Sequence, residues 1–203
     1  MSELPIITVG VVGDTHVPDR APSLAPGLLE GLQSAGVGHI LHAGDVCSQR
    51  VLAELGELAP VSAARGNRDF LMSPLLPMTV ELEFAGVKLG LLHGHGGMRR
   101  YWQDKLAYIV EGYRVERYTR LAENTLPQAR VLVYGHSHRP ENHWVGGRLI
   151  FNAGAAVGFR LGKADYPPSF GLLRFYPGGQ VVGEIISLRS VELRGGAWVS
   201  TGK

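Results

Sequence analysis

Residues 6–16 read IITVGVVGDTH, an apolar and largely β-branched run that passes directly into Gly13-Asp14 and His16. Such a run is typical of a buried strand, because a strand covered on both faces carries apolar side chains throughout. A loop with prolines at 18, 22 and 26 follows it. The stretch therefore predicts a buried strand whose C-terminal end opens into a functional loop.

The same pattern recurs twice further along the chain. Apolar residues at helical spacing near 28–32 and 48–58 precede two more short strands, at 39–42 and 60–64. These strands also end in polar pairs, Gly44-Asp45 and Gly66-Asn67. The order β-α-β-α-β predicts a parallel sheet.

The remainder of the chain has a different character. Its apolar runs are paired across short turns, which predicts hairpins at 79–84 with 87–92, 141–145 with 148–151, and 171–176 with 180–186. Between them, Trp102, Leu106 and Val110 belong to an apolar stripe that predicts one long helix over 102–121. No linker divides the chain, so we expect a single domain over 1–203.

Composition limits the class of protein. The 203 residues are 45% hydrophobic and carry a formal charge of +2, which is typical of one compact domain and too balanced for binding nucleic acid by bulk charge. Cys47 is the only cysteine, so neither an intrachain disulfide nor a Cys-x-x-Cys metal site can form. No secretion signal or membrane span is recognisable, so we expect a cytoplasmic enzyme or binding domain without a membrane partner.

Polar residues gather at or just beyond the C-terminal ends of the expected strands. They are Asp14, His16, Asp45, Asn67, His93, His136 and His138. Ligand sites in open α/β sheets form at this edge. Mixed nitrogen and oxygen donors suit manganese, iron or zinc, whereas magnesium and calcium prefer oxygen alone. An isolated histidine is usually a core residue, but this collective placement favours a metal site.

These residues resemble a known family. The ordered motifs are Asp14-Thr-His16, Gly44-Asp45, Gly66-Asn67-Arg68-Asp69, His93-Gly-His95 and Gly135-His136-Ser137-His138. They are similar to the five motifs of the calcineurin-like metallophosphoesterases, and in particular to the small YfcE-type phosphodiesterase branch, to which Vps29 is related. The resemblance extends from Ile6 to Ile186. It implies an α/β sandwich of two mixed β-sheets between helices, with a helical insertion at about 99–123.

The resemblance also implies a dinuclear site. It places Asp14, His16 and His138 on one metal, Asn67, His93 and His136 on the other, and Asp45 between them. Two divalent ions, with Mn2+ expected and Fe, Ni or Zn as alternatives, would share a bridging hydroxide that attacks phosphorus in line. This predicts a metal-dependent phosphoesterase, most simply a phosphodiesterase.

The catalytic residues that we expect beside the metals are Asn67, Arg68 and His95. Many members of the family have histidine where this chain has Arg68. Because arginine does not release a proton, Arg68 could only neutralise phosphate charge. His95 is then the other candidate acid, although it could equally contact substrate or orient a ligand.

Several alternatives stay open. The substrate could be a phosphodiester, a phosphomonoester or a nucleotide pyrophosphate, and an interaction scaffold like Vps29 would need no turnover at all. The basic and aromatic residues of 99–120 leave contact with a nucleotide, with single-stranded nucleic acid or with a second copy open, although a solvated helix face is the commoner role. We expect His42 to make a structural hydrogen bond, Cys47 to pack, and Asn152 to begin a tight turn beneath the site.

Overall fold

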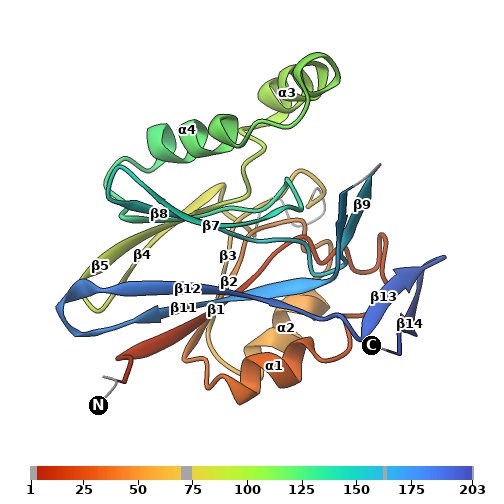
Figure 1. The fold of residues 1–203 in the computed structure, drawn as a ribbon, viewed down its shortest axis with the longest axis horizontal. Helices are drawn as coiled ribbons and strands as arrows, with labels where there is room; N and C mark the ends of the chain where they lie inside the picture. Colours follow the sequence, from red (N-terminus) through yellow and green to blue (C-terminus); the bar gives the residue numbers. More distant parts are fainter. Residues whose placement is uncertain (1–3, 70–74, 162–163, 203) are drawn as a thin grey trace.

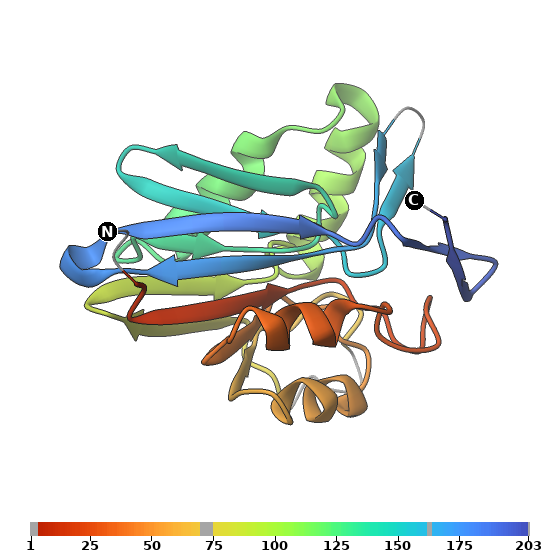
Figure 2. The same cartoon turned by 60° about the horizontal axis from the view of Figure 1, so that its bottom comes forward.

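The computed structural model describes residues 4–69, 75–161 and 164–202 and forms two facing β-sheets with helices outside them (Figures 1 and 2). The first sheet has the strand order β12-β11-β1-β2-β3. Its strands are β1 (Ile7–Val12), β2 (His39–His42), β3 (Val61–Ala63), β11 (Ser169–Phe175) and β12 (Val181–Ser187). The β1–β2 and β2–β3 pairs are parallel, and the β1–β11 and β11–β12 pairs are antiparallel.

The second sheet has the order β4-β5-β6-β8-β7. Its strands are β4 (Thr79–Phe84), β5 (Val87–Leu92), β6 (Val131–Val133), β7 (Pro140–Val145) and β8 (Arg148–Ala153). Here β5, β6 and β8 run parallel, and hairpins add β4 and β7 at the edges. Two mixed sheets between helices is the fold class that the sequence predicts, and the structure confirms it.

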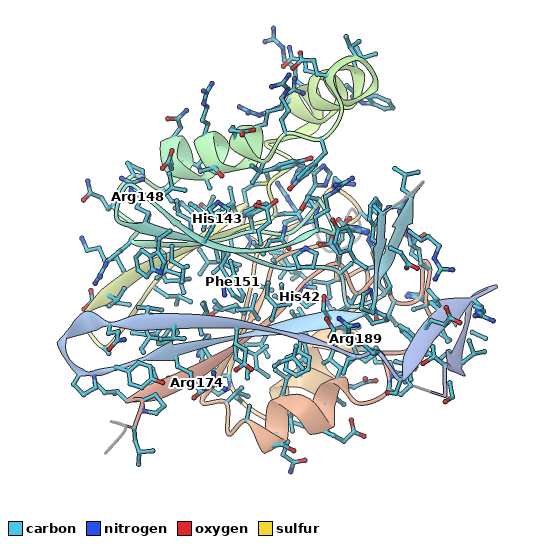
Figure 3. All side chains as sticks on the ribbon, viewed as in Figure 1. His42, His143, Arg148, Phe151, Arg174 and Arg189 are labelled. Carbon is cyan, nitrogen blue, oxygen red and sulfur yellow. The ribbon has the colours of Figure 1, made fainter. Side chains whose placement is uncertain are left out.

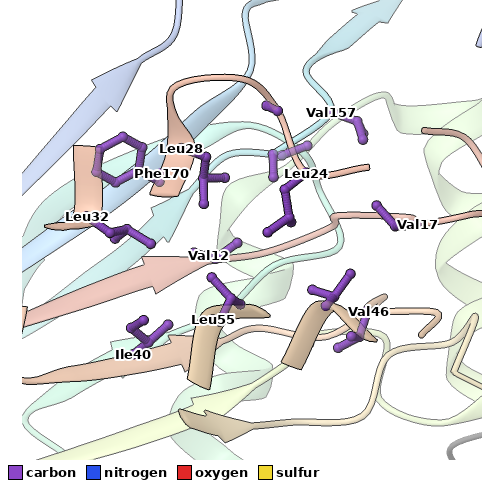
Figure 4. Close-up of a cluster of buried hydrophobic side chains, with 14 of the residues drawn as sticks. Val12, Val17, Leu24, Leu28, Leu32, Ile40, Val46, Leu55, Val157 and Phe170 are labelled. Atoms are coloured by element: carbon purple, nitrogen blue, oxygen red, sulfur yellow. The ribbon is translucent and has the colours of Figure 1, made fainter. Parts of the chain in front are cut away.

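Four helices lie outside the two sheets in the part of the chain that the structure describes. They are α1 (Leu28–Ser34), α2 (Gln49–Gly56), α3 (Met98–Glu111) and α4 (Val115–Thr125). Helices α1 and α2 lie against the first sheet, where Leu28 and Leu55 pack with Val12, Ile40 and Phe170 (Figure 4). Helix α4 lies against the second sheet, where Ala122 and Leu126 belong to a separate apolar cluster with Leu132 and Ile150. A third cluster, which includes Val11, Leu91 and Phe151, fills the space between the sheets.

The expectation of one helix over 102–121 is wrong. Two helices, α3 and α4, occupy this part of the chain, and Gly112 between them has φ +73°, a left-handed conformation that ends an α-helix. The stripe on α3 is also not a buried one, because Trp102, Leu106 and Val110 are 56%, 66% and 84% exposed. Side-chain periodicity correctly indicated helical structure. It did not indicate the break between the two helices, or that the apolar face of α3 is exposed to solvent.

Two small hairpins extend the chain beyond the predicted strands. They are β9 (Phe159–Leu161) with β10 (Ala164–Tyr166), and β13 (Val191–Arg194) with β14 (Ala197–Ser200). A short 3-10 turn at Pro177–Gly179 joins β11 to β12. Among the residues that the structure describes, no helix is both long and apolar enough to span a membrane.

Replacement of Phe151 by alanine tests the packing between the sheets. Phe151 is fully buried and is labelled in Figure 3 between the two sheets. Glycines of β11 and β12 make room for its ring: a Cβ added at Gly171 would lie 2.4 Å from the ring, and one at Gly183 would lie 2.8 Å from it. Loss of the ring should lower the free energy of unfolding by about 3–5 kcal/mol.

Urea denaturation measures this change, with Val182→Ala as the control. Val182 is an apolar residue of β12 in the facing sheet but is 40% exposed, so its truncation should cost under about 0.5 kcal/mol. Equal losses in the two variants would contradict the assignment of Phe151 to the inter-sheet core.

Candidate metal centre

The loops that follow five strands of the two sheets meet at one edge of the molecule. Asp14 and His16 follow β1, Asp45 follows β2, and Asn67 follows β3. The second sheet adds His93 after β5, and His136 and His138 after β6. Because these strands are parallel within each sheet, their carboxyl ends bring all seven predicted ligands together.

The backbone at these loops is unusual. Five of the seven predicted ligands have a positive φ between 48° and 65°: Asp14, His16, Asp45, His136 and His138. L-residues rarely adopt this conformation, and it persists only where surrounding contacts impose it, most often at functional sites. The turn geometry thus directs each of these side chains back toward the same space.

The first group of donors surrounds Asp14. His138 Nε2 lies 3.2 Å from Asp14 Oδ1 and 3.2 Å from His16 Nε2. His16 Nε2 is 4.0 Å from the same carboxylate oxygen and 3.8 Å from Asp45 Oδ2. These atoms are close enough to act as ligands of one ion.

The second group of donors surrounds His93. Its Nε2 lies 3.1 Å from Asn67 Oδ1, 3.2 Å from His136 Nδ1 and 3.5 Å from Asp45 Oδ1. Asp45 therefore faces the second group with one carboxylate oxygen and the first group with the other. This is the arrangement that a shared ligand of two ions requires.

The donor set fits a cation because one of its buried oxygens lacks a proton donor. Asp14 is fully buried, and its Oδ2 accepts a hydrogen bond from the His136 backbone N–H at 3.0 Å. Its Oδ1, which faces His16 and His138, has no hydrogen-bond partner among the described residues. An unpaired buried carboxylate oxygen is costly, and a divalent ion would satisfy it.

The protonation states also suit metal binding. Burial lowers the pKa of His16 to about 3 and that of His136 to about 3, so both imidazoles are neutral near pH 7. Burial alone would raise the pKa of Asp14, but His138, His93 and His16 together lower it, so Asp14 is ionised. The pKa of His93 is raised, because Asp45 and Asp14 outweigh the effect of burial. A cation would displace that proton.

Residues behind the donors hold them in place. His93 Nδ1 donates to the Ala43 carbonyl at 2.7 Å, which leaves Nε2 free to bind a metal. The Asp69 carboxylate accepts three backbone N–H groups, from Asp45 at 3.0 Å, Gly66 at 2.7 Å and Cys47 at 2.8 Å. Asp69 thus ties the loop after β2 to the loop after β3, a role that its place in a motif did not reveal.

One glycine is indispensable to this contact between loops. A Cβ at Gly66 would lie 2.2 Å from both the backbone nitrogen and Oδ1 of Asp45. Any side chain at this position would displace Asp45. The glycine of the Gly-Asn pair is therefore required for close approach of two backbones.

His42 and Asn152 support the site from below, as the sequence indicated. His42 Nδ1 accepts from the Gly44 N–H at 3.2 Å, so its Nε2–H can donate to Thr15 Oγ1 at 3.1 Å. Asn152 is fully buried, and its side-chain amide donates to the Gly135 carbonyl at 3.1 Å and to Ser137 Oγ at 3.0 Å. Both residues fix loops that carry candidate ligands.

A further group of potential donors comprises His16, Asp19 and Cys47. Burial raises the pKa of the Cys47 thiol to about 12, with the nearby Asp45 and Asp69 charges adding to the effect. The thiol therefore stays protonated, and a protonated thiol is a poor ligand. Among these three residues, the imidazole of His16 is the one already assigned to the first group.

The expected catalytic residues lie around the candidate ligands. Arg68 is 40% exposed, its side chain forms an ion pair with Asp19, and its backbone N–H donates to Asp45 Oδ1 at 2.8 Å. His95 is buried with its ring centroid 5.4 Å from that of His93. Burial, with the charge of His93, lowers the pKa of His95 to about 4, so its imidazole is neutral near pH 7.

The helical segment reaches the site through tyrosines. The Tyr118 ring lies between Tyr113 and Tyr134, at centroid distances of 5.7 and 5.8 Å, and is 6.1 Å from His136. Tyr113 and Tyr134 both donate to the Glu141 carboxylate. The first turn of α4 is thereby anchored beside a candidate ligand.

Comparison with known proteins agrees with this geometry. Residues 7–175 match the calcineurin-like phosphoesterase superfamily domain, and the chain belongs to that superfamily. Its family is that of the metallophosphoesterases, which are metal-dependent hydrolases. The resemblance drawn from the sequence motifs is confirmed at this level.

Individual relatives point the same way. A probable metallophosphoesterase of Methanothermobacter thermautotrophicus is 32% identical over 75% of this chain and 79% of its own length. Another, of Methanocaldococcus jannaschii, is 33% identical over 65% of this chain, but the match spans only 59% of that relative. Among solved structures, Vps29 of Entamoeba histolytica complexed with zinc is 26% identical, with a TM-score of 0.67 over 89% of this chain and 98% of its own.

The Asp69→Asn variant tests the link between the two loops. An asparagine amide would turn an N–H donor toward at least one of the three backbone N–H groups, so the loops should separate. We expect affinity for Mn2+ or Zn2+ to fall by roughly 10–100-fold, as measured by calorimetry. Glu83→Gln, an exposed carboxylate on β4, is the control and should bind metal like the unmodified chain. Unchanged affinity in Asp69→Asn would remove the positioning role.

Proposed function

We propose that the chain is a dinuclear metal-dependent phosphodiesterase that acts on small phosphodiesters. The observation that supports this best is the position of Asp45, whose two carboxylate oxygens face two separate groups of donors. When bound, a pair of divalent ions would activate a water molecule near neutral pH and neutralise the charge of a phosphate ester. In this proposal, Asp14, His16 and His138 hold one ion, and Asn67, His93 and His136 hold the other.

Arg68 supports substrates whose leaving group departs without proton assistance. Its guanidinium lies at the rim of the centre and always carries its proton, so it can attract the phosphate but cannot protonate a leaving group. His95, neutral and buried against His93, is better suited to contact substrate or position a ligand than to act as the acid. A diester with a good leaving alcohol needs less proton assistance.

We also propose Mn2+ as the metal, with Fe, Ni or Zn as alternatives, because the donors mix imidazole nitrogen with carboxylate and amide oxygen. The cytoplasm is the location we propose, since its reduced state suits the single thiol of Cys47. A small phosphodiester or nucleotide is the proposed substrate. Metal-stripped protein, tested with bis-p-nitrophenyl phosphate and p-nitrophenyl phosphate while each metal is added back, separates diesterase from monoesterase activity.

An interaction scaffold is the second candidate function. It is favoured by the structural similarity to Vps29, one example of which is described as a zinc complex. Metal binding therefore does not discriminate between the two candidates, and turnover does. Two ions bound per chain without hydrolysis of any phosphate ester would favour the scaffold.

The Asp45→Asn variant tests the shared ligand. It keeps the shape of the side chain and an oxygen that can accept from Arg68, but it removes the charge that both ions would share. We expect turnover of bis-p-nitrophenyl phosphate to fall by at least about 100-fold and less than two ions to bind per chain. Turnover and metal content by mass spectrometry are the measurements.

Asp45→Ala should be equally inactive, and circular dichroism should show that the fold is retained. Glu81→Ala, which removes an exposed carboxylate of β4, is the matched control and should keep full activity. Activity close to that of the unmodified chain in both Asp45 variants would rule out the dinuclear proposal.

Arg68→Ala tests the electrostatic role of the guanidinium. A charge-assisted hydrogen bond to phosphate contributes about 1.5–3 kcal/mol, so kcat/KM for the diester should fall roughly 10–100-fold with both metals retained. Arg68→Lys, which restores the charge, should recover part of the loss. If Arg68→Ala and Arg68→Lys were equally impaired, charge would not be the reason for the effect.

A further inference from the structure

A cavity of about 430 Å³ lies next to the candidate metal centre, in the range typical of small-molecule sites. Phe159 lines it and also contacts the centre, because its ring centroid is 5.6 Å from that of His138. Arg20 lines it as well, and its backbone N–H donates to the carbonyl of His16 at 2.7 Å. The cavity therefore begins where the first group of donors ends.

The wall of the cavity is positively charged. Arg20 and Arg189 line it, and neither side chain has a hydrogen-bond or ion-pair partner among the residues described. Two carboxylates also line it, but both are paired: Asp165 with Arg160 at 3.0 Å, and Glu192 with Arg160 at 3.5 Å and with Arg194. Two guanidinium groups are thus left to bind an anion.

The same cavity has a flat aromatic side. The rings of Phe159 and Tyr166 are nearly parallel, with an interplanar angle of 18° and centroids 6.4 Å apart. The guanidinium carbon of Arg139, the residue after His138, lies 5.8 Å from the Phe159 centroid and 6.0 Å from that of Tyr166. Aromatic and guanidinium planes of this kind stack on nucleobases.

We propose that this cavity binds a nucleotide, with the base on Phe159 and Tyr166 and its phosphate on Arg20 and Arg189. The nucleotide would be one half of the substrate cleaved at the metal centre. In that respect the inference rests on the proposed function, but the cavity itself contains none of the candidate metal ligands. A bare phosphate would leave the aromatic side unused, and a nucleoside would leave the two arginines unused.

Titration calorimetry on the full chain tests this inference with three probes: adenosine monophosphate, adenosine and inorganic phosphate. Each is measured with Mn2+ and with excess EDTA, which separates the cavity from the metals. We expect the monophosphate to bind at least about tenfold more tightly than either fragment in EDTA, where the cavity acts without the metals. Equal binding of the monophosphate and inorganic phosphate in EDTA would overturn the inference.

Two variants locate the site. Arg189→Ala should lower the affinity for the monophosphate at least about tenfold and leave the affinity for adenosine unchanged, because it removes a charge-assisted contact with the phosphate. Tyr166→Leu should lower the affinity for both the monophosphate and adenosine. Arg174→Ala is the matched control. Arg174 lies in β11 and is paired with Glu184 of β12, at the end of these strands that is distant from Arg189 in Figure 3. Equal weakening in Arg174→Ala would indicate an effect of net charge and overturn the assignment.

The result is separable from the proposed function. Tight binding of the monophosphate in EDTA, without turnover of any diester, would support the proposed nucleotide site and contradict the proposed diesterase function. The opposite result is metal-dependent turnover of bis-p-nitrophenyl phosphate with no preference for binding the monophosphate over phosphate in EDTA. It would support the proposed diesterase function and contradict the proposed nucleotide site.

Discussion

The interaction on which the rest of the structure depends is the burial of Asp14 and Asp45 among imidazoles, where strands of both sheets end. Buried carboxylates are tolerated only when each oxygen has a hydrogen-bond donor or a cation. Asp14 Oδ2 and Asp45 Oδ1 have backbone donors, whereas Asp14 Oδ1 has none within residues 4–69, 75–161 and 164–202. The fold thus brings five strand ends together around a buried carboxylate oxygen that a cation would satisfy.

Holding these groups in place constrains the loops more than the strands. Asp69 accepts hydrogen bonds from three backbone N–H groups of two loops. The absence of a side chain at Gly66 lets those loops approach so closely. The left-handed backbone at the candidate ligands adds strain, which the extensive inter-sheet core offsets. Stability of the sandwich and affinity of the centre are therefore linked through the same few turns.

Much of this could be predicted from the sequence, because each candidate ligand directly follows an apolar run and parallel strands bring their ends together. The break at Gly112 could not, since a left-handed glycine and a helical one look alike in a periodic pattern. The cavity could not be predicted either. Phe159 begins β9, whereas Arg20 and Arg189 lie in two loops far from it in the sequence, and no local pattern relates the three. Tertiary packing alone brings such groups together.

The surroundings of the centre bear on the choice between enzyme and scaffold. A scaffold requires a surface that matches its partner, and it gains nothing from unpaired guanidinium groups directed at a cavity beside buried imidazoles. An enzyme would gain, because a substrate held by Arg20 and Arg189 would be oriented beside the neighbouring donors before the reaction. The metal centre and the cavity share the loop that carries His16 and Arg20. Binding of a ligand at either site should therefore restrict the motion of this loop at the other site. Such coupling favours a substrate that occupies both the metal centre and the cavity.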